Sequence, residues 1–494
     1  MAATKATDIL VQPPNLIRLK AAPNNYDWGK IGNASLVSKV GPNAVGRDFR
    51  VEDNKPYSEA SLLLDIREFH LWHLWTLPTA DAILWMGTHR NGPAHLFDAP
   101  DIPLQKLITT SPTHTLGAPL LEKWPQSPQL PFLFKILSIQ KALPLQVHPD
   151  KDLAAQLHAK DPSSFVDANH KPEIAVAIGP PLRTVQGADP VLVRPADQDA
   201  AFTGFVGFRP LEEIRTFLLG VSELWRAVGD DGLVDSFITI PSQALLRRVF
   251  GALVSRPDGA EAEVRALYKR VKESANAGRG AGAAIGRGDG AEEVGRLVLK
   301  VGDQYPGDVG VLACVFCMNY VKLKRGEAVY IGADEVHAYL EGDIIECMAT
   351  SDNVLNAGFV DPAERRQQAH AFVSALSFTA RPASHWALPH EPYHLARAHR
   401  TQAYRPPLEE FAVLGTTLAQ NAREERLGPI KGPMVGIVLK GTVRIRASAE
   451  AKEEENEEMR AEMGTVVYVR PGNEVALELV EGDEGEVWWA EWGA

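Results

Sequence analysis

Three short segments, far apart along the chain, carry side chains that a fold must bring together to bind a metal. They are residues 145–150 (LQVHPD), 169–173 (NHKPE) and 335–339 (EVHAY). If the first segment is a strand, Gln146 and His148 project from the same face, because successive side chains alternate across a pleated backbone. Glu173 and His337 then complete a set of two imidazoles, one carboxylate and one amide oxygen.

This donor set predicts a catalytic metal site. Four such ligands, with a position left for water or substrate, suit zinc acting as a Lewis acid better than a sealed structural zinc. The same donors accept manganese or iron, because several divalent ions share these ligand preferences. We therefore expect an enzyme that binds one Zn²⁺ per chain.

Length and composition predict a soluble protein of two or three domains. The chain has 494 residues, of which 45% are apolar and 23% are charged. No apolar run approaches the roughly 18 residues needed to span a bilayer, so we expect no membrane contact. Residues 1–15 lack the pattern of a secretory signal, which predicts a cytoplasmic protein. The sequence does not specify an oligomer, and we expect a monomer.

The net charge of −12 argues against nucleic acid as a partner, because phosphate binding favours a basic face. The cysteines Cys314, Cys317 and Cys347 are too few for a disulfide framework, which agrees with a reducing compartment. The Cys314–Cys317 spacing is typical of redox or zinc motifs. It lies in an apolar run, residues 311–320, that predicts a buried strand, and no second pair follows, so we expect buried thiols.

Hydrophobic periodicity changes twice along the chain. Up to about residue 180 the pattern is that of short strands, for example at residues 132–139 and 173–178. Apolar residues then recur at helical spacing in residues 211–225 and 264–271, which predicts a helical insert between about 190 and 300. Strand patterns return at Val309 and continue to the end, and the charged run 450–462 predicts a solvated loop.

Residues 277–290 are rich in glycine and could be taken for a phosphate-binding loop. Such a loop joins a strand to a helix, whereas this one follows a predicted helix. A flexible linker is the better interpretation.

A weak internal repeat relates two glycine-led segments, residues 326–331 and 464–469. Eleven residues after each leading glycine lies His337 in the first copy and Val475 in the second. The repeat predicts two related β-barrels, of which one keeps a metal ligand. Coincidence is the alternative, because glycine followed by alternating apolar residues is common in β proteins.

Segments over almost the whole chain resemble type I mannose-6-phosphate isomerases, in particular the fungal ones. They are residues 25–30, 84–89, 131–135, 145–150, 169–173, 207–210, 304–308 and 326–353. The resemblance implies a mainly β fold with an inserted α-helical domain and two cupin-like β-barrels (jelly rolls). It implies a discontinuous catalytic cupin domain (1–187 and 310–387), a helical domain (188–309) and a C-terminal cupin-like domain without metal ligands (388–494).

The activity implied is a zinc-dependent interconversion of mannose 6-phosphate and fructose 6-phosphate, which feeds GDP-mannose synthesis. The implied zinc ligands are the four residues named above. The resemblance also places Lys171, Tyr339 and Glu346 in the substrate pocket. Glu346 is a reasonable proton carrier, and Lys171 would bind an oxygen or act as an acid, unless it is only a surface lysine. His170 would orient its loop.

Two departures from the family pattern fall in this pocket. Asn356 stands where the family has an arginine regarded as catalytic or substrate-binding, and an amide cannot hold phosphate or an oxyanion as a guanidinium can. Pro144 stands where the family usually has a serine. Arg365 or Arg366 would be the nearest compensating cation.

These departures leave three interpretations of the protein's function open. One is a slow isomerase. A second is a catalytically weakened paralogue that acts as a zinc-containing sugar-phosphate-binding or regulatory protein. A third is a cupin-type storage or scaffold protein, which four intact ligand positions argue against.

Residues 60–83 have no counterpart in the family. They are either a translated intron or a surface insertion, and an exposed loop with this many Leu and Trp residues would favour aggregation. We expect His70 and His73 within it to have no function.

Overall fold

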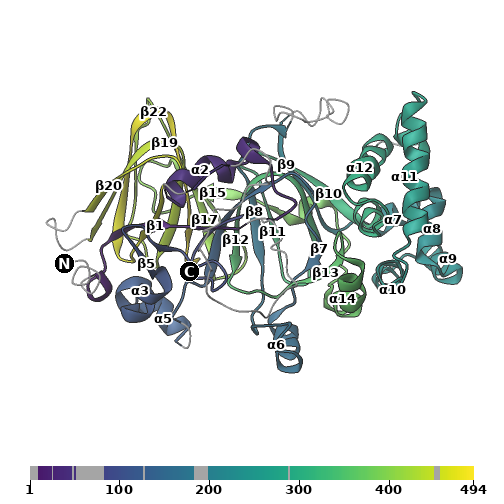
Figure 1. The fold of residues 1–494 in the computed structure, drawn as a ribbon, viewed down its shortest axis with the longest axis horizontal. Helices are drawn as coiled ribbons and strands as arrows, with labels where there is room; N and C mark the ends of the chain where they lie inside the picture. The colour runs from purple at the N-terminus through teal and green to yellow at the C-terminus, as the bar shows by residue number, and fades with distance from the viewer. Residues whose placement is uncertain are drawn as a thin grey trace, which may run out of the picture.

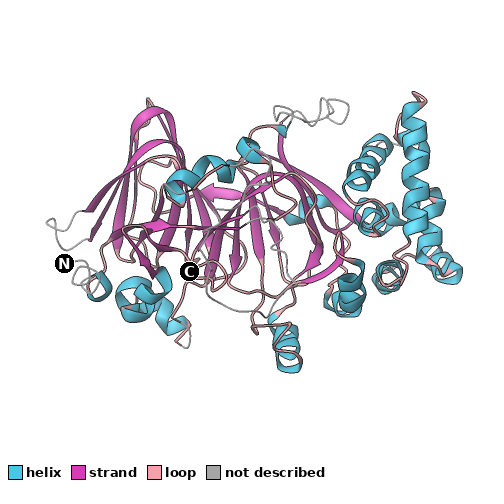
Figure 2. Ribbon diagram, in the orientation of Figure 1, coloured by secondary structure: helices cyan, strands magenta, loops and turns pink. Residues whose placement is uncertain are grey.

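Two sheets of eleven strands each form most of the structure, and helices lie around them (Figures 1 and 2). The structure is a computed structural model and describes residues 9–24, 26–46, 49–51, 83–125, 128–182, 199–286, 290–449 and 457–493. The insertion at residues 60–83, with His70 and His73, lies outside the described residues apart from its last residue. The mainly β prediction is confirmed.

The first sheet, here called the central sheet, is organised around one long strand, β12, which pairs with β6, β7, β8 and β9. Its strands are β2 (Ala22–Asn24), β3 (Ile83–Met86), β6 (Phe132–Ile139), β7 (Leu145–Val147), β8 (Glu173–Ala177), β9 (Ala200–Phe208), β10 (Met318–Lys324), β11 (Ala328–Ile331), β12 (His337–Ala349), β13 (Leu355–Gly358) and β14 (Ala387–Leu388). All pairings are antiparallel. The strands predicted near residues 132–139 and 173–178 are confirmed, and β7 confirms the strand assumed for Gln146.

The second sheet, here called the C-terminal sheet, lies beside the first at one end of the molecule (Figure 1). Its strands are β1 (Leu16–Lys20), β4 (His95–Leu96), β5 (Ala99–Pro103), β15 (His390–Pro392), β16 (Thr401–Tyr404), β17 (Ala412–Ala419), β18 (Glu424–Leu427), β19 (Met434–Ala449), β20 (Glu457–Ala461), β21 (Val466–Val469) and β22 (Asn473–Glu491). β1 pairs with β21, so N-terminal strands complete this sheet. The limits predicted for the C-terminal domain, 388–494, do not include β1, β4 and β5.

The two sheets share one apolar core. Ile174 and Ile345 of the central sheet belong to the same buried cluster as Val413 and Trp488 of the C-terminal sheet, and all four are at most 5% exposed. Burial of such side chains is the main favourable term in folding, so the sheets are held in a fixed relation. A loop of the C-terminal sheet can therefore place a side chain accurately against the central sheet.

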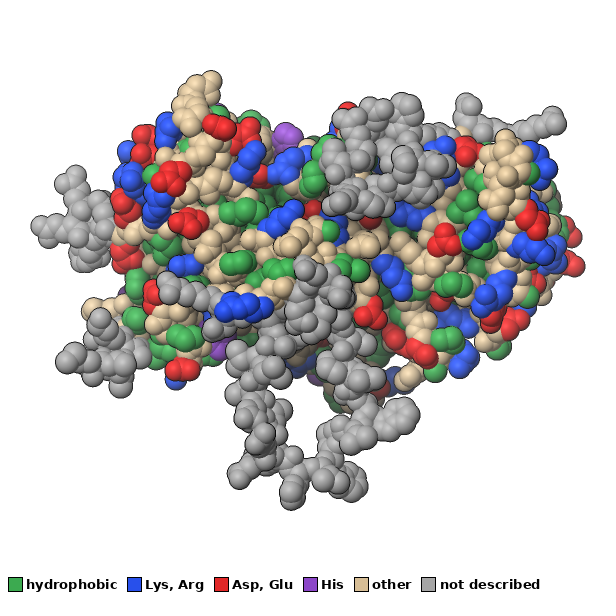
Figure 3. All heavy atoms as spheres, turned by 45° about the horizontal axis from the view of Figure 1, so that its top comes forward, with side chains coloured by type: hydrophobic (Ala, Val, Ile, Leu, Met, Phe, Trp, Pro, Cys, Tyr) green, Lys and Arg blue, Asp and Glu red, His purple; other side chains and the backbone are tan. Residues whose placement is uncertain are grey.

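Six of the helices between β9 and β10 gather at the opposite end of the molecule (Figure 1). They are α7 (Leu211–Gly220), α8 (Ser222–Val228), α9 (Asp231–Thr239), α10 (Gln243–Val254), α11 (Glu261–Asn276) and α12 (Ala291–Gln304). The helical periodicity is thus confirmed, although the run 211–225 breaks at Val221, whose backbone is extended. The glycine-rich segment connects α11 to α12. On the face drawn in Figure 3, acidic and basic side chains are interspersed over these helices.

The remaining helices surround the sheets. They are α2 (Leu36–Ala44), α3 (Leu104–Thr110), α4 (Pro112–Leu116), α5 (Ala118–Lys123), α6 (Lys151–Lys160), α13 (Gly310–Leu312) and α14 (Pro362–Ala375), with short 3₁₀ turns at Gly32–Ala34, Gly282–Ala284 and Ala383–Trp386. α14 lies where only strands were predicted. Its start carries a recognisable signal, because the Asp361 side chain accepts a hydrogen bond from the Ala363 amide and proline occupies the first turn. Within the described ranges, no helix has both the length and the apolar character needed to cross a bilayer.

The predicted strand over residues 311–320 is wrong in its first part. α13 is followed by a π-helical turn, Ala313–Cys317, and the strand begins only at Met318. A short apolar run does not distinguish a buried helix from a buried strand. The prediction of buried thiols is confirmed, since burial raises the pKa of Cys317 to about 12 and that of Cys314 well above its ordinary value.

The predicted loop at 450–462 is wrong over its second half. Residues 457–461 form β20, which pairs with β19, and residues 450–456 are outside the described part. The charges that suggested a loop make cross-strand ion pairs, for example between Arg446 Nε and Glu458 Oε2 at 2.7 Å. A charged sequence can therefore be an exposed edge strand.

Candidate metal centre

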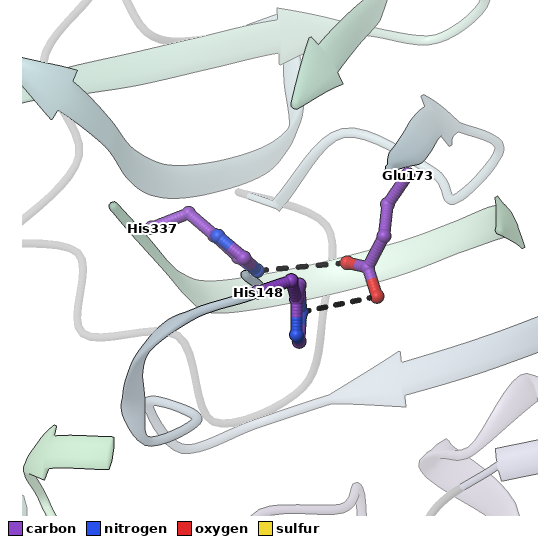
Figure 4. Close-up of side chains that lie close together, drawn as sticks. All are labelled: His148, Glu173 and His337. Carbon is purple, nitrogen blue, oxygen red and sulfur yellow. Dashed lines mark ion pairs between the residues drawn. The ribbon is translucent and has the colours of Figure 1, made fainter. Parts of the chain in front are cut away.

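Three of the four predicted ligands converge on one point. His148 directly follows β7, and Glu173 and His337 are the first residues of β8 and β12. One donor atom from each lies within 4.8 Å of the others (Figure 4). His148 Nε2 is 3.3 Å from Glu173 Oε1, and His337 Nε2 is 3.5 Å from Glu173 Oε2. Segments nearly 190 positions apart thus meet because β12 pairs with both β7 and β8.

Hydrogen bonds on the far side of each imidazole fix which nitrogen faces the cluster. His148 Nδ1 lies 2.8 Å from the carbonyl oxygen of Asn353, and His337 Nδ1 lies 3.1 Å from that of Glu335. A carbonyl oxygen can only accept, so each Nδ1 carries a proton, and in the neutral imidazole Nε2 then presents its lone pair to the cluster.

These lone pairs provide a test of whether a cation fits. Both Nε2 atoms are buried and have no hydrogen-bond partner among the described residues, although they approach the Glu173 carboxylate. Lone pairs that face a carboxylate repel it unless a positive charge lies between them. The arrangement therefore fits a divalent metal held by His148, Glu173 and His337.

The electrostatics leave His148 and Glu173 in the protonation states that metal binding requires. Burial and the charge of Lys171 together lower the pKa of His148 to about 4, against the opposing effect of Glu173, so this imidazole is neutral at pH 7. Burial alone would raise the pKa of Glu173. The interactions with His148 and Lys171 outweigh that effect, so the pKa lies well below the usual range and the carboxylate is ionised.

Gln146, the fourth predicted ligand, lies opposite His337 in the β7–β12 pair. It lines the same cavity as Glu173. Its backbone position is therefore compatible with the set, and its role as a ligand stays a prediction.

A cavity of about 260 Å³ opens beside the cluster. Its charged and amide-bearing lining residues are Lys135, Gln146, Lys171, Glu173, Glu346, Asp352 and Asn356. Tyr26, Trp28 and Trp85 supply aromatic surface. A small cavity with several convergent polar groups and a few apolar walls is typical of a site for a small polar ligand.

The structure also places the three residues that the resemblance assigned to the pocket. The Lys171 side chain is 14% exposed and its Nζ lies 3.4 Å from Glu173 Oε1, so the surface-lysine alternative is wrong. Glu346 lines the cavity. Tyr339 does not line the cavity: it is fully buried with its ring centroid 5.7 Å from that of His337, and its hydroxyl has no partner among the described residues.

Lys135 is a site residue that the sequence analysis missed. It lies opposite Glu346 in the β6–β12 pair, and its Nζ is 2.6 Å from Glu346 Oε2, with both side chains 5% exposed. Burial raises the pKa of Glu346, and the charge of Lys135 opposes that rise. The available signal was a lone lysine inside an apolar strand, because an unpaired buried ammonium is costly.

The two departures from the family pattern both line this cavity, as expected. Asn356 Nδ2 donates to Glu364 Oε1 at 2.8 Å, so its amide is held by α14. The suggestion that Arg365 or Arg366 compensates for the missing cation is wrong. Arg365 donates to the carbonyl oxygens of Val254 and Arg256, at the end of α10, and Arg366 is exposed and lines a different cavity.

Comparison with known proteins agrees with this geometry. Residues 76–187 match the catalytic-domain model of type I phosphomannose isomerase. Mannose-6-phosphate isomerases from Candida albicans and Saccharomyces cerevisiae are each 31% identical to this chain over 94% of its length, covering 94% and 95% of their own. The one from Ogataea parapolymorpha is 32% identical over 94% of this chain and 95% of its own.

Solved structures share the fold. A mutant phosphomannose isomerase from Salmonella typhimurium superposes with a TM-score of 0.67 at 20% identity, covering 97% of this chain and 100% of its own. A zinc-bound mannose 6-phosphate isomerase gives a TM-score of 0.68, with the same identity and coverage. With relatives of more than 30% identity matched over nearly the whole chain, this protein belongs to the type I mannose-6-phosphate isomerase (phosphomannose isomerase) family.

Proposed function

We propose that this protein is a zinc-dependent aldose–ketose isomerase that interconverts mannose 6-phosphate and fructose 6-phosphate and so feeds GDP-mannose synthesis. The observation that carries the proposal is the convergence of the Nε2 atoms of His148 and His337 and the Glu173 carboxylate beside a cavity lined by two lysines. Family membership supports it, as do the zinc-bound solved relatives.

One zinc ion would be held by His148, Glu173, His337 and Gln146. When bound, it supplies a Lewis acid that stabilises negative charge on a sugar oxygen. The proton on each Nδ1 keeps both imidazoles oriented toward the ion, because the backbone carbonyls that accept these protons are fixed.

The residues of the cavity would then handle the proton. Isomerisation moves a proton between C1 and C2 through an enediol, which needs a carboxylate or similar base near both carbons. Glu346 fits this role, since burial raises its pKa toward the working pH. Lys171 would bind a sugar oxygen or donate a proton to it. Burial raises the pKa of Tyr339, so its hydroxyl stays protonated and can donate a hydrogen bond.

A second candidate is a catalytically weakened paralogue that binds sugar phosphates or has a regulatory role. Asn356 favours it, because a neutral amide replaces the arginine of the family and neither Arg365 nor Arg366 reaches the cavity. The metal would then mainly stabilise the fold.

The architecture that accompanies this function is also a proposal. Each of two domains would contain one cupin-like barrel, with the catalytic domain at 1–187 and 310–387, the helical domain at 188–309 and the C-terminal domain at 388–494. Strands cross these limits, because β1, β4 and β5 pair into the C-terminal sheet and β9 pairs into the central sheet. The internal repeat supports it: β11 and β21 each begin two residues after a glycine with positive φ, Gly326 at 85° and Gly464 at 89°. We further propose a cytoplasmic monomer.

A coupled assay for fructose 6-phosphate separates the two functions. The isomerase proposal expects turnover of mannose 6-phosphate by the zinc-loaded protein, loss after chelation and recovery when zinc is added. If the zinc-loaded protein binds mannose 6-phosphate in a calorimeter without turning it over, the weakened paralogue is correct.

A further inference from the structure

A carboxylate of the C-terminal sheet bridges two loops of the central sheet. Glu410 lies between β16 and β17 and is 7% exposed. His170 Nε2 lies 2.8 Å from Glu410 Oε1, and Lys151 Nζ lies 3.2 Å from the same oxygen. One oxygen atom of Glu410 thus contacts both Lys151 and His170, which lie 19 positions apart in the sequence.

The two bridged loops are the ones that carry metal donors. Lys151 lies three residues after His148, at the start of α6. His170 lies three residues before Glu173 and directly next to Lys171. A shift of either loop would therefore move a donor or the cavity lysine, and misplacements of about 1 Å are enough to weaken a preorganised site.

Glu410 is itself anchored. The next residue, Phe411, is fully buried in the core that the two sheets share. Burial would raise the pKa of Glu410, but the hydrogen bond and charge of His170 and the charge of Lys151 lower it to about 2, so the carboxylate is ionised at neutral pH. The backbone of Glu410 is thus held by the buried neighbour Phe411, and its carboxylate carries a negative charge.

We infer that Glu410 is a positioning residue, by which the C-terminal sheet holds the His148 and Glu173 segments at the separation that metal binding requires. This inference rests on the proposed function for its catalytic meaning. It assigns a role to the C-terminal sheet, which the sequence analysis expected to lack metal ligands, and to His170.

The neighbouring residue provides a matched control. Glu409 is exposed and its carboxylate pairs with Lys123, away from the bridged loops. Glu409→Ala therefore removes one carboxylate from the same loop without touching His170 or Lys151. Glu410→Gln keeps an oxygen that can accept from His170 and removes only the charge.

The test measures the rate at which the zinc-loaded, full-length protein releases zinc to a colorimetric chelator. We expect Glu410→Ala to accelerate release about three- to tenfold, less than the about 10–100-fold typical when a direct hydrogen-bond partner of a ligand is lost. Glu410→Gln should restore most of the slow release, and Glu409→Ala should match the natural protein. Equal release from Glu410→Ala and Glu409→Ala would overturn the inference.

His170→Ala tests the bridge from its other side, and it keeps the inference testable should Glu410→Ala fail to fold. It should accelerate zinc release by a similar factor, and the double variant should add little, because both changes remove the same hydrogen bond between His170 and Glu410. Additive effects, or no effect of His170→Ala, would contradict the bridge. If release behaves as expected while the natural protein shows no isomerase activity, the positioning role stands and the proposed function fails.

Discussion

Asn356 Nδ2 donates a hydrogen bond to Glu364 Oε1 at 2.8 Å, across the junction of β13 and α14. Asn356 lines the cavity, and its own Oδ1 is buried without a partner among the described residues. An acidic side chain thus already stands beside the position where the family has an arginine. The local surroundings are suited to a cation that this chain lacks.

Substituting Asn356→Arg should raise kcat/KM for mannose 6-phosphate by about tenfold or more, since a guanidinium can bind phosphate or a developing oxyanion through two hydrogen bonds. Glu364 would hold the new side chain. Steady-state assays at saturating zinc provide the measurement. Asn356→Gln, which adds length without charge, is the control and should not raise kcat/KM. An unchanged kcat/KM in Asn356→Arg would show that the missing cation does not limit the reaction.

Removing the metal should abolish turnover and lower the melting temperature. A ligand that binds only the folded state stabilises it by about 2.7 kcal/mol at one hundred times its Kd. His337→Ala should bind far less than one zinc per chain by elemental analysis. His390→Ala, at an exposed histidine of β15, should keep full zinc content. Full zinc content in His337→Ala would contradict the proposed ligand set.

Lys135→Met should destabilise the protein by about 3–5 kcal/mol, because it leaves the Glu346 carboxylate buried and unpaired. The double variant Lys135→Met with Glu346→Leu should recover most of that stability, since no buried charge remains. Urea unfolding at pH 7 measures both. If the double variant were less stable than Lys135→Met, the interpretation of Lys135 and Glu346 as a buried ion pair would be wrong. The double variant, which lacks the carboxylate, should be inactive if Glu346 carries the proton.

Glu491 should make stability depend on pH. Burial raises its pKa to about 7 from the ordinary 4.5, against the opposing effects of Tyr393 and Arg405. Between these pH values the folded protein keeps a proton that the unfolded chain releases, so this group's contribution to stability falls as the pH rises from about 4.5 to 7. The loss is on the order of 3 kcal/mol at 1.36 kcal/mol per pKa unit.

Glu491→Gln should remove this dependence and still accept the hydrogen bond from Tyr393. Urea unfolding at pH 5 and pH 8 should show the natural protein losing stability relative to the variant. Glu484→Gln, at an exposed carboxylate of β22 that pairs with Lys440, is the control and should follow the natural protein. If the stability of all three proteins changed equally between pH 5 and pH 8, the raised pKa of Glu491 would be refuted.

The sequence alone determined the residue types of the site and the local structure around most of them. Short β-type runs predicted the strands of residues 132–139 and 173–178, and helical spacing predicted α11, because both patterns are read within ten or so residues. The family resemblance supplied Gln146, His148, Glu173 and His337 as a set. It also identified Asn356 and Pro144 as departures that share one pocket.

Only the tertiary structure decided which distant residues meet. The pairing of β6 with β12 sets Lys135 against Glu346, and the pairing of β1 with β21 carries the N-terminus into the C-terminal sheet. Arg365 lies three residues from Gln368, which contacts Asn356, yet it turns toward α10. Strand register and side-chain direction depend on how the whole chain buries its shared core, so distant residues determine them. Residue chemistry and short-range periodicity depend only on neighbouring positions in the sequence.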